Sequence, residues 1–501
     1  MPDANPTRLR PRSARQRRPL SGRSRSLPPP SCLLPRAAGR LRDAHAALGI
    51  VLAGRHSPRL DRAGGRDRQN NPRIEHPPPS PTAVDATGAP PADDIATSWI
   101  ADFDDPALPA LVAEALGQNF DLKAAAARVK AARARAEQAG AARLPDVAAD
   151  LSASRAKSGA SGDTSNSFEL GANIGWEIDL WDRLGRTAEA TLAEVEANRA
   201  GYRAARLALA ANVARFRFDA IEAEQQLRLA DGTVASFEES LKTIEQRYRL
   251  GIGAALDVRL ARENLATARS GRQVRARDRD VAARSLEILL GRYPAGALDI
   301  PQDLPELRQA IPVGLPADLL NRRPDIVEAN EKLLATEHRL AAARANRLPD
   351  VRLTASGGTA SDALRSLMDW DALVWSLVGD LTQPIWKGEE LSAQVALAEA
   401  NQQQAWADYA TVVLQAFREV ESALTAQTSL THQAAALRVA QEEAIAAAVL
   451  ASDRYRQGLS DIVTLLSTQR REFEAKSALL ATFRQRLHAR IDLYLALGGG
   501  F

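Results

Sequence analysis

The stretch Phe168–Leu180, FELGANIGWEIDL, alternates strictly between two kinds of side chain. Bulky apolar residues occupy every second position, and glycine, an amide or a carboxylate stands between them. A period of two indicates a β-strand with one apolar and one polar face. Such a strand suits either a membrane barrel with a water-filled interior or a half-buried sheet in a soluble protein. This segment alone leaves both interpretations open.

Val147–Ala153 alternates in the same way, and weaker versions of the alternation occur at Val351–Ala355 and Leu373–Leu381. The segment 158–167, SGASGDTSNS, is predicted to be an exposed turn after the first of these strands. Each chain would therefore contribute four strands, which are too few to close a barrel. Either the strands form a soluble sheet, or several chains pool them.

Two long helical patterns follow the strands. Residues 182–249 and 387–456 contain no proline, and many of their apolar positions are alanine. At ~1.5 Å per residue, about 65 residues make a rod of roughly 100 Å. Patterns of this length are typical of coiled coils or helical arrays. Small side chains allow a helix to pack closely on two neighbours, as in the wall of a tube, but an antiparallel coiled coil remains an alternative.

The chain beyond about Ser98 contains one unit twice. The sequence RLPDV occurs at Arg143–Val147 and again at Arg347–Val351, and Arg-Tyr-Arg-x-Gly occurs at Arg247–Gly251 and again at Arg454–Gly458. The copies lie about 200 residues apart, far more than the period of a solenoid repeat. The two halves should therefore contain the same helices and strands.

Each half is predicted to have an alanine-rich helix (Leu108–Ala142 and Asp325–Asn346), two strands, and two long helices separated by the Arg-Tyr-Arg-x-Gly break. The fold class is mainly α with a small β part. We predict a first repeat at 98–300, a second at 301–501, and a separate amino-terminal region at 1–97.

The composition excludes several classes of function. Arginine is concentrated in the first 75 residues, so the remainder is acidic and unsuited to nucleic acid. The single cysteine excludes an intrachain disulfide and a cysteine-based metal cluster. The chain has no uninterrupted apolar run of about 18 residues, so no membrane-spanning helix is predicted. No nucleotide, metal or nucleophile motif stands in a fitting context, so neither a cofactor nor an enzyme is predicted.

The amino-terminal region 1–97 is rich in Pro, Arg, Ser and Gly, and it is predicted to be disordered or processed. Within it, Arg40 and Arg42 precede the short apolar stretch Ala44–Gly54. Positive charge before a short apolar core that ends in small residues is the chemistry of an export signal. A chance match is the alternative.

Lipidation is doubtful in this sequence. Leu52-Ala53-Gly54 matches the beginning of a lipoprotein signal, but Arg55 stands where the acylated cysteine would be. Cys32 has no apolar segment before it and is a poor candidate. Our hypothesis is that the true start lies later than Met1 or that this stretch is altered.

These features together resemble the TolC-like outer membrane efflux protein family, in particular the NodT-like lipoprotein subfamily of resistance–nodulation–division (RND) efflux systems. The resemblance covers about Ser98–Phe501. It rests on Trp99–Phe120 (WIADFDDPALPALVAEALGQNF), both RLPDV stretches, Trp181, Asn321–Ile326 (NRRPDI), Gln383–Trp386 (QPIW), both Arg-Tyr-Arg-x-Gly breaks, and Leu495–Phe501 (LALGGGF).

The resemblance implies a homotrimer in the outer membrane that projects into the periplasm. Its twelve pooled strands would close one transmembrane β-barrel in contact with outer-membrane lipid, and its helices would form an α-helical barrel. The trimer would dock on a periplasmic adaptor (membrane fusion) protein and an inner-membrane RND pump. It would be a passive duct that exports small molecules, including drugs.

The resemblance also implies an aperture just after the second break, at Tyr455–Ser467. Family members place acids at positions matching Thr464 or Ser467, where this sequence has hydroxyls. That departure puts an acidic selectivity ring in doubt. Val463 matches an apolar constriction position and is retained.

Two acids near the breaks, Asp461 and Asp257, could substitute for the missing ring. We predict that Asp461 and Val463 line the closed aperture, where every residue of a trimer occurs three times. Either residue could instead be a solvated helix end. Tyr248 and Tyr455 could lock the helix ends through their hydroxyls or simply pack there.

Two alternatives to an efflux duct remain open at this point. A duct of a type I protein secretion system would have the same sequence features. A soluble coiled-coil scaffold would explain the long helices but neither the alternating strands nor the duplication. The transported substrates cannot be read from the chain, because a duct selects weakly and the pump chooses the cargo.

Overall fold

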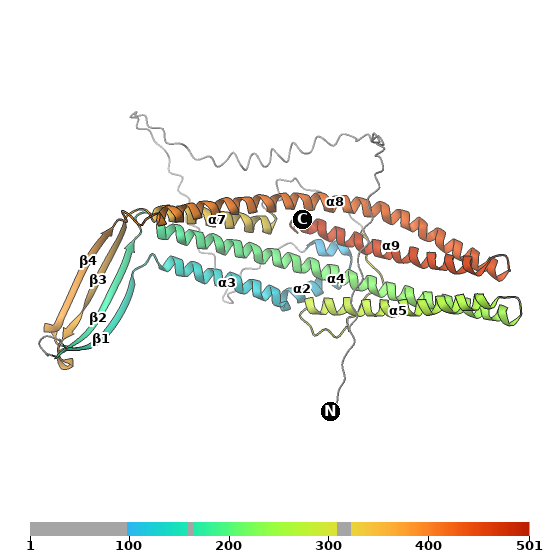
Figure 1. Ribbon diagram of the computed structural model, residues 1–501, viewed down its shortest axis with the longest axis horizontal. Coiled ribbons are helices and arrows are strands. Elements are labelled where there is room, and N and C mark those ends of the chain that lie inside the picture. Colours follow the sequence, from blue (N-terminus) through green and yellow to red (C-terminus); the bar gives the residue numbers. More distant parts are fainter. Residues whose placement is uncertain (1–97, 158–163, 308–321, 500–501) are drawn as a thin grey trace, which may run out of the picture. The chain divides into compact units, whose positions relative to one another are not determined.

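The computed structural model describes residues 98–157, 164–307 and 322–499. The poor lipidation candidate Cys32, the position Arg55 where an acylated cysteine was expected, and the predicted signal segment Ala44–Gly54 lie outside these residues. The described elements, in order, are η1 (Ser98–Phe103), α2 (Leu108–Gln118), α3 (Phe120–Ala141), β1 (Asp146–Lys157), β2 (Thr164–Ile178), α4 (Arg183–Arg249), α5 (Ala255–Leu289), α7 (Pro324–Ala345), β3 (Asp350–Ser361), η3 (Leu364–Ser366), η4 (Trp370–Ala372), β4 (Leu373–Thr382), α8 (Glu390–Arg456) and α9 (Ile462–Ala496) (Figure 1).

The predicted duplication is present in the structure. Helices α4 and α8 have 67 residues each, α5 and α9 have 35 each, and α3 and α7 have 22 each. The order of helix, two strands and two long helices is the same in both halves. The protein is therefore mainly α-helical with a small sheet, as the sequence predicts.

The predicted ends of the long helices need two corrections of a few residues. Helix α8 begins at Glu390 rather than Lys387, because Gly388 has φ +62°, which no α-helix contains. Helix α4 begins after Asp182, whose φ is +59°. The carboxylate of Asp179 accepts hydrogen bonds from the backbone N–H groups of Leu184 (3.1 Å) and Gly185 (2.7 Å), so it satisfies two free donors of the first turn.

The single helix predicted over Leu108–Ala142 is wrong, because the chain breaks at Asn119. This residue has an extended backbone, and its side-chain oxygen accepts a hydrogen bond from Leu122 N at 3.1 Å. Its amide nitrogen donates to the Leu289 carbonyl at 3.1 Å, at the end of α5. Asn119 therefore caps α3 and ties its start to a distant helix end.

The four strands form one antiparallel sheet in the order β1-β2-β3-β4. The β2–β3 pair joins the two halves, with Ile178 opposite Val351 and Phe168 opposite Ser361. Residues Thr164–Ser167, predicted to be turn, continue β2 and pair with the end of β1. Strand pairing there satisfies the backbone of a segment whose polar composition suggested a loop.

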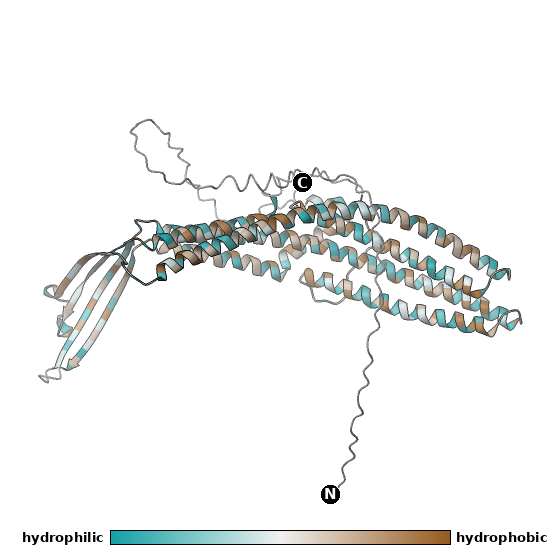
Figure 2. Ribbon diagram, turned by 45° about the horizontal axis from the view of Figure 1, so that its top comes forward, coloured by the Kyte–Doolittle hydropathy of each residue, from teal (hydrophilic) through white to brown (hydrophobic). Residues whose placement is uncertain are grey.

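Both faces of this sheet are exposed in the single chain, and the hydropathy of its residues alternates along the strands (Figure 2). On one face, Asn173 donates to the carboxylate of Asp150 at 2.6 Å, and Arg352 lies opposite Glu177 and Asp380. The other face carries exposed apolar side chains: Val147, Leu151, Ile174, Trp176, Trp375, Leu377 and Leu381.

The main core lies where η1 and α2 pack against α4 and α9. Trp99 stacks on Tyr494 with ring centroids 5.3 Å apart, and Phe103 lies 5.2 Å from Phe218. The Tyr494 hydroxyl donates to Asp102, and burial together with this carboxylate raises the pKa of Tyr494 to about 12. These contacts fasten the start of the described chain to both halves.

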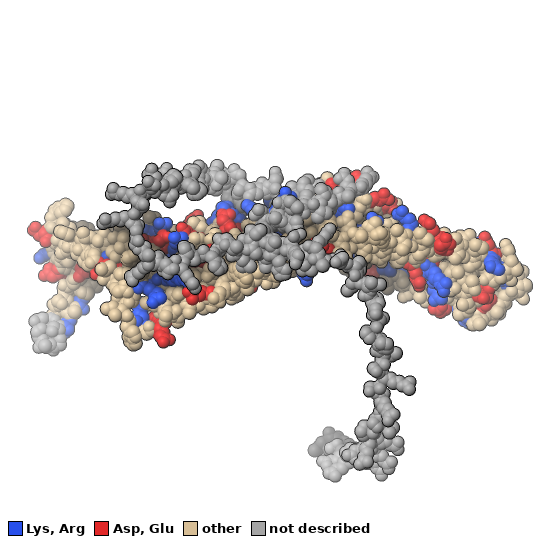
Figure 3. Space-filling model, turned by 90° about the horizontal axis from the view of Figure 1, so that it is seen from above, with Lys and Arg blue, Asp and Glu red and all other residues tan. Residues whose placement is uncertain are grey.

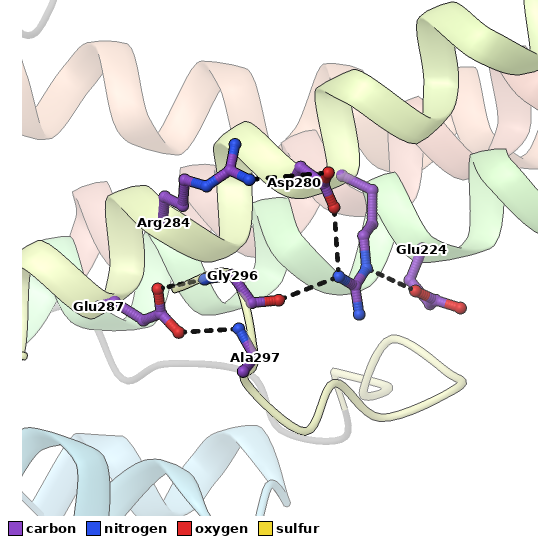
Figure 4. A network of polar contacts seen from close by, with 7 residues as sticks. Glu224, Asp280, Arg284, Glu287, Gly296 and Ala297 are labelled. Atoms are coloured by element: carbon purple, nitrogen blue, oxygen red, sulfur yellow. Dashed lines mark hydrogen bonds and ion pairs between the residues drawn. The ribbon is translucent and has the colours of Figure 1, made fainter. Parts of the chain in front are cut away.

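A polar network fixes the chain that leaves α5 (Figure 4). The carboxylate of Glu287 accepts hydrogen bonds from the backbone N–H groups of Gly296 (2.7 Å) and Ala297 (2.9 Å). Arg279 donates to the Gly296 carbonyl at 3.2 Å and to Glu224 of α4 at 3.1 Å. Residues 296–297, just after α5, are thereby held against α5 and α4.

Acidic and basic side chains are mixed along the helices on the face shown in Figure 3. Most of the ion pairs are exposed, such as Arg269 with Glu238 at 2.8 Å and Arg272 with Asp231 at 2.8 Å. Exposed pairs of this kind stabilise a protein little. Among the described helices, none has an apolar stretch long enough to cross a bilayer.

Gly358 in β3 provides a test of the sheet. A Cβ at this position would lie 2.3 Å from the Leu170 carbonyl oxygen and 2.7 Å from the Gly171 Cα, so the paired backbone would have to move. At Gly379 in β4 a Cβ would meet nothing within 4 Å. We expect Gly358→Ala to cost about 1–3 kcal/mol of stability, as at other overpacked sites, and so to lower the temperature at which the sheet melts.

The matched variant Gly379→Ala should leave the melting temperature close to that of the parent protein. Circular dichroism of detergent-purified protein, recorded at a β-sheet wavelength against temperature, compares the two. Equal melting of both variants would contradict the close approach of β2 and β3.

Candidate functional site

The candidate site is the end of the helices where α4 turns into α5 and α8 turns into α9, here called the hairpin end (residues 247–258 and 454–467). Gly251 and Gly458 both adopt the left-handed backbone, with φ of +74° and +78°. Gly251 N donates to the Tyr248 carbonyl and Ile252 N to the Arg247 carbonyl, each at 3.0 Å. This is the Schellman arrangement, which satisfies the last carbonyls of a helix.

The second break has the same bonds, from Gly458 N to the Tyr455 carbonyl at 3.0 Å and from Leu459 N to the Arg454 carbonyl at 2.8 Å. The Arg-Tyr-Arg-x-Gly motif therefore has a physical explanation. Its glycine is the residue that can leave an α-helix through the left-handed region without strain.

An apolar cluster joins the two turns. It consists of buried side chains from all four helices: Phe237, Ile244, Val258, Ala261, Leu265, Tyr455, Ile462, Leu465 and Leu466. Tyr455 is only 4% exposed, whereas the equivalent Tyr248 of the first half is 49% exposed. Burial, aided by the carboxylate of Asp257, raises the pKa of Tyr455.

Arg247 fastens the first turn to the second. Its guanidinium donates from Nη1 to the carbonyls of Tyr455 (3.1 Å) and Arg456 (3.2 Å), and it lies 5.0 Å from the centre of the Tyr455 ring. A cation at a helix carboxyl end also interacts favourably with the helix dipole. This role of Arg247 was not predicted from the sequence, although its place before Tyr248 in a repeated motif was a signal for it.

The predicted aperture residues lie at the start of α9. Asp461 is the N-cap, and its Oδ1 accepts a hydrogen bond from Thr464 N at 2.7 Å. This bond is the main reason that the pKa of Asp461 lies below its ordinary value of 3.8. Val463 is 61% exposed, and the Ser467 hydroxyl donates to the Thr464 carbonyl at 3.1 Å.

The structure thus brings Asp461, Val463, Thr464 and Ser467 into the first two turns of one helix. Asp257 lies in the first turn of α5, near Tyr455. Tyr455 packs in the apolar cluster, and the lock through tyrosine hydroxyls stays a prediction. So does the lining of an aperture by Asp461 and Val463.

A family model described as "Outer membrane efflux protein" matches this chain over residues 111–292 and 315–499, which is most of its length and one match in each half. The chain belongs to the outer membrane efflux protein family. The family is the one that the sequence motifs resemble. The matched ranges include all four long helices and all four strands.

Individual relatives agree with this assignment. The chain is 34% identical to outer membrane protein OprJ of Pseudomonas aeruginosa over 413 residues, 80% of this chain and 86% of OprJ. It is 31% identical to the cation efflux system protein CusC of Escherichia coli O6:H1 over 412 residues, 80% of this chain and 88% of CusC. The solved outer-membrane channel OprN has a TM-score of 0.76 and 30% identity, covering 80% of this chain and 92% of that one.

These findings identify the protein as an outer-membrane efflux channel component and not an enzyme. Within the described part of the chain, no group of three His, Cys, Asp or Glu side chains could hold a metal ion. Because the relatives of this chain are outer-membrane channels, the alternative of a soluble coiled-coil scaffold is wrong. Its appeal came from the long helices, which this family also uses.

Asp461 allows charge and capping to be separated. Asp461→Asn retains a side-chain oxygen for Thr464 N but removes the charge, whereas Asp461→Ala removes both. If the carboxylate faces the aperture, Asn should lower the cation preference of single channels in planar bilayers while α9 keeps its start. Ala should do the same and also loosen the first turn of α9. If the cation preference of Asp461→Asn were unchanged, the prediction that Asp461 lines the aperture would be wrong.

The pH dependence follows from the same carboxylate. Because the pKa of Asp461 is lowered, the cap contributes stability at neutral pH, and this stability is lost as the pH falls below the ordinary aspartate value and through the lowered pKa. We therefore expect the parent channel to keep its cation preference at pH 5. At lower pH, protonation of Asp461 should reduce the cation preference of the parent channel. The Asp461→Asn channel should not show this change, because it has no carboxylate at that position.

Arg247 provides the second test of the hairpin end. Arg247→Ala leaves the carbonyls of Tyr455 and Arg456 without their donor, which costs about 1 kcal/mol for a partly exposed site. We expect larger single-channel conductance, because the polar contact between the two turns is lost and only the apolar cluster still holds them together. The control is Arg249→Ala, whose side chain is 76% exposed and has an ion pair with Glu245 at 3.8 Å. Equal conductance of the two variants would contradict a fastening role for Arg247.

Proposed function

We propose that this chain is the passive outer-membrane duct of a tripartite efflux pump and works as a homotrimer. Four strands from each copy pool into a 12-stranded barrel in the outer membrane, and the helices enclose a tunnel in the periplasm. The trimer docks on a periplasmic adaptor protein and an inner-membrane RND pump, which supplies the energy. The exported molecules are small, and the names of several relatives refer to efflux of toluene, other solvents or cations.

The unequal burial of two equivalent helices carries this proposal. Helix α4 packs against α3, α5, α7 and α9, whereas α8 packs mainly against α7 and α9. By the internal duplication, α3 corresponds to α7 and α5 to α9. Within one chain, α4 has α7 and α9 of the second half on one side, but α8 has no following half beside it. The helices that would take the places of α7 and α9 beside α8 are α3 and α5 of another copy.

Individual residues show the same asymmetry. Leu207 and Ala190 of α4 are 5% and 1% exposed. Their equivalents in α8, Leu414 and Leu397, are 56% and 63% exposed. Exposed leucines at positions that are buried in the equivalent helix support a surface that a second copy covers.

The sheet supports closure in the same way. The β2–β3 pair joins the two halves within a chain, so its counterpart is β4 paired with β1 of the next copy. Unpaired strand edges cost several kcal/mol per group in lipid, and closure removes them. The exposed apolar face with Leu151 and Leu377 then faces lipid, and the face with Asp150 and Glu177 lines the interior.

The hairpin end is the aperture of this duct. In a trimer, Asp461 and Val463 occur three times around the axis at the start of α9. Three exposed valines narrow or dewet the passage, and three carboxylates attract cations. Opening requires the two turns to separate, which the bonds from Arg247 oppose.

The free side of α8 gives the test of the trimer. Leu414→Arg and Leu397→Arg each place a charge where the proposed neighbour packs, so we expect loss of trimer and loss of resistance in an efflux-deficient strain. The control is Val449→Lys, which is also an exposed apolar residue of α8 but has Lys242 as its equivalent in α4. Native mass spectrometry in detergent and survival on an efflux substrate measure both effects.

The parent protein and Val449→Lys should give three chains per particle. A parent protein that is monomeric and stable in water without detergent would overturn the proposed function. Trimers in all three variants would overturn the assignment of the interface.

A further inference from the structure

A reciprocal polar contact joins the two halves of the chain midway along the helices. Gln226 of α4 donates from Nε2 to the Ser477 carbonyl at 3.1 Å, and the Ser477 hydroxyl of α9 donates to Gln226 Oε1 at 2.8 Å. Gln226 is only 4% exposed, and its Nε2 also donates to Glu222 at 2.8 Å. The amide is thus buried with both of its atoms bonded.

The duplication repeats both residue types. Aligning α4 with α8 and α5 with α9 at their identical lengths places Gln433 at the position of Gln226 and Ser270 at the position of Ser477. Gln433 and Ser270 are both exposed in the single chain. The contact present between α4 and α9 therefore has all its chemical parts on α8 and α5.

Helices α8 and α5 do not pack along one another within the described chain, since α8 packs on α7 and α9 and α5 packs on α4. A contact between Gln433 and Ser270 must therefore join two copies. We propose that Gln433 of one copy and Ser270 of the next form the same reciprocal pair at every seam between copies. This inference rests on the homotrimer proposed above and specifies its contacts.

The pair has a physical task that alanine cannot perform. Small apolar residues alone do not fix how far one helix is shifted along its neighbour, because the contacts are alike at several shifts. A buried amide is costly when unpaired, so a glutamine that meets its serine at one position selects that position. Three pairs within chains and three between them then hold all copies at one height around the tunnel.

The hairpin end contains a second repeated pair. Arg247 and Tyr455 meet within the chain, and their equivalents are Arg454 and Tyr248. Arg454 is exposed and Tyr248 is 49% exposed, so both are available to neighbouring copies in the same sense. This second match supports the same arrangement of copies.

Cysteine cross-linking tests the pair, in a chain with Cys32→Ser so that no other thiol is present. Gln433→Cys with Ser270→Cys is oxidised in isolated membranes, and reducing and non-reducing gels are compared. We expect dimers and trimers that reductant converts to monomers. Each single variant should remain monomeric on the gel.

The control pair is Gln226→Cys with Ser477→Cys, which should link within one chain and leave the mass of a monomer. This control shows whether cysteines at these two positions can form a disulfide, because the same residue types at equivalent positions are replaced. If the control links and native mass spectrometry shows trimers, but the Gln433 and Ser270 positions link no copies, the seam pair is wrong and the trimer survives. If native mass spectrometry shows monomers, the proposed function fails as well.

A second measurement applies even if the paired cysteines hinder assembly. Gln433→Ser and Ser270→Gln are expected singly to lower the temperature at which the trimer dissociates on gels. The two together exchange the partners and should restore most of that loss. A double variant no better than the worse single variant would overturn the pairing.

Discussion

A chain made of two equivalent halves side by side has one flank that its own residues cannot cover. Here α4 is enclosed by α3, α5, α7 and α9, and α8 has half of those neighbours. The same holds for the sheet, where β2 and β3 are paired on both sides and β1 and β4 are edges. In the proposed assembly, one operation covers both flanks, namely the addition of further copies in a ring. The helices and the sheet therefore support the proposed ring independently of each other.

The Arg-Tyr-Arg-x-Gly motif at the hairpin end has two separate structural roles, which its sequence does not distinguish. Its glycine ends each long helix through the left-handed backbone, and this need is purely local. Its first arginine contacts the other half, where Arg247 binds the end of α8 and the ring of Tyr455. Local need explains why the motif occurs twice, and the long-range contact explains why an arginine stands before the tyrosine.

Much of the fold could be predicted because its signals are local. Alternation along Phe168–Leu180 and the absence of proline from the long helices fix the elements to within a few residues. The break at Asn119 could not be predicted, since alanine-rich flanks favour a helix and the residue that stabilises the break, Leu289, is distant in sequence. The contacts of Arg247 were missed for the same reason. At the candidate site, the repeated motif marked the segment, but the capping bond of Asp461 depends on the path of the backbone at the turn, which the residue types alone do not specify.

The two halves also differ at the hairpin end, in how α5 and α9 begin. Helix α9 begins at Asp461, whose carboxylate holds the N–H of Thr464, whereas α5 begins at Ala254, which has no capping side chain. An uncapped first turn unwinds more readily, by roughly 1 kcal/mol for a typical cap. The turn before α5 is instead retained by Arg247, through its bonds to α8. The capping bond of the second hairpin lies within it, whereas the polar contact of the first is made to its neighbour, so loss of the arginine contact weakens the first hairpin more than the second.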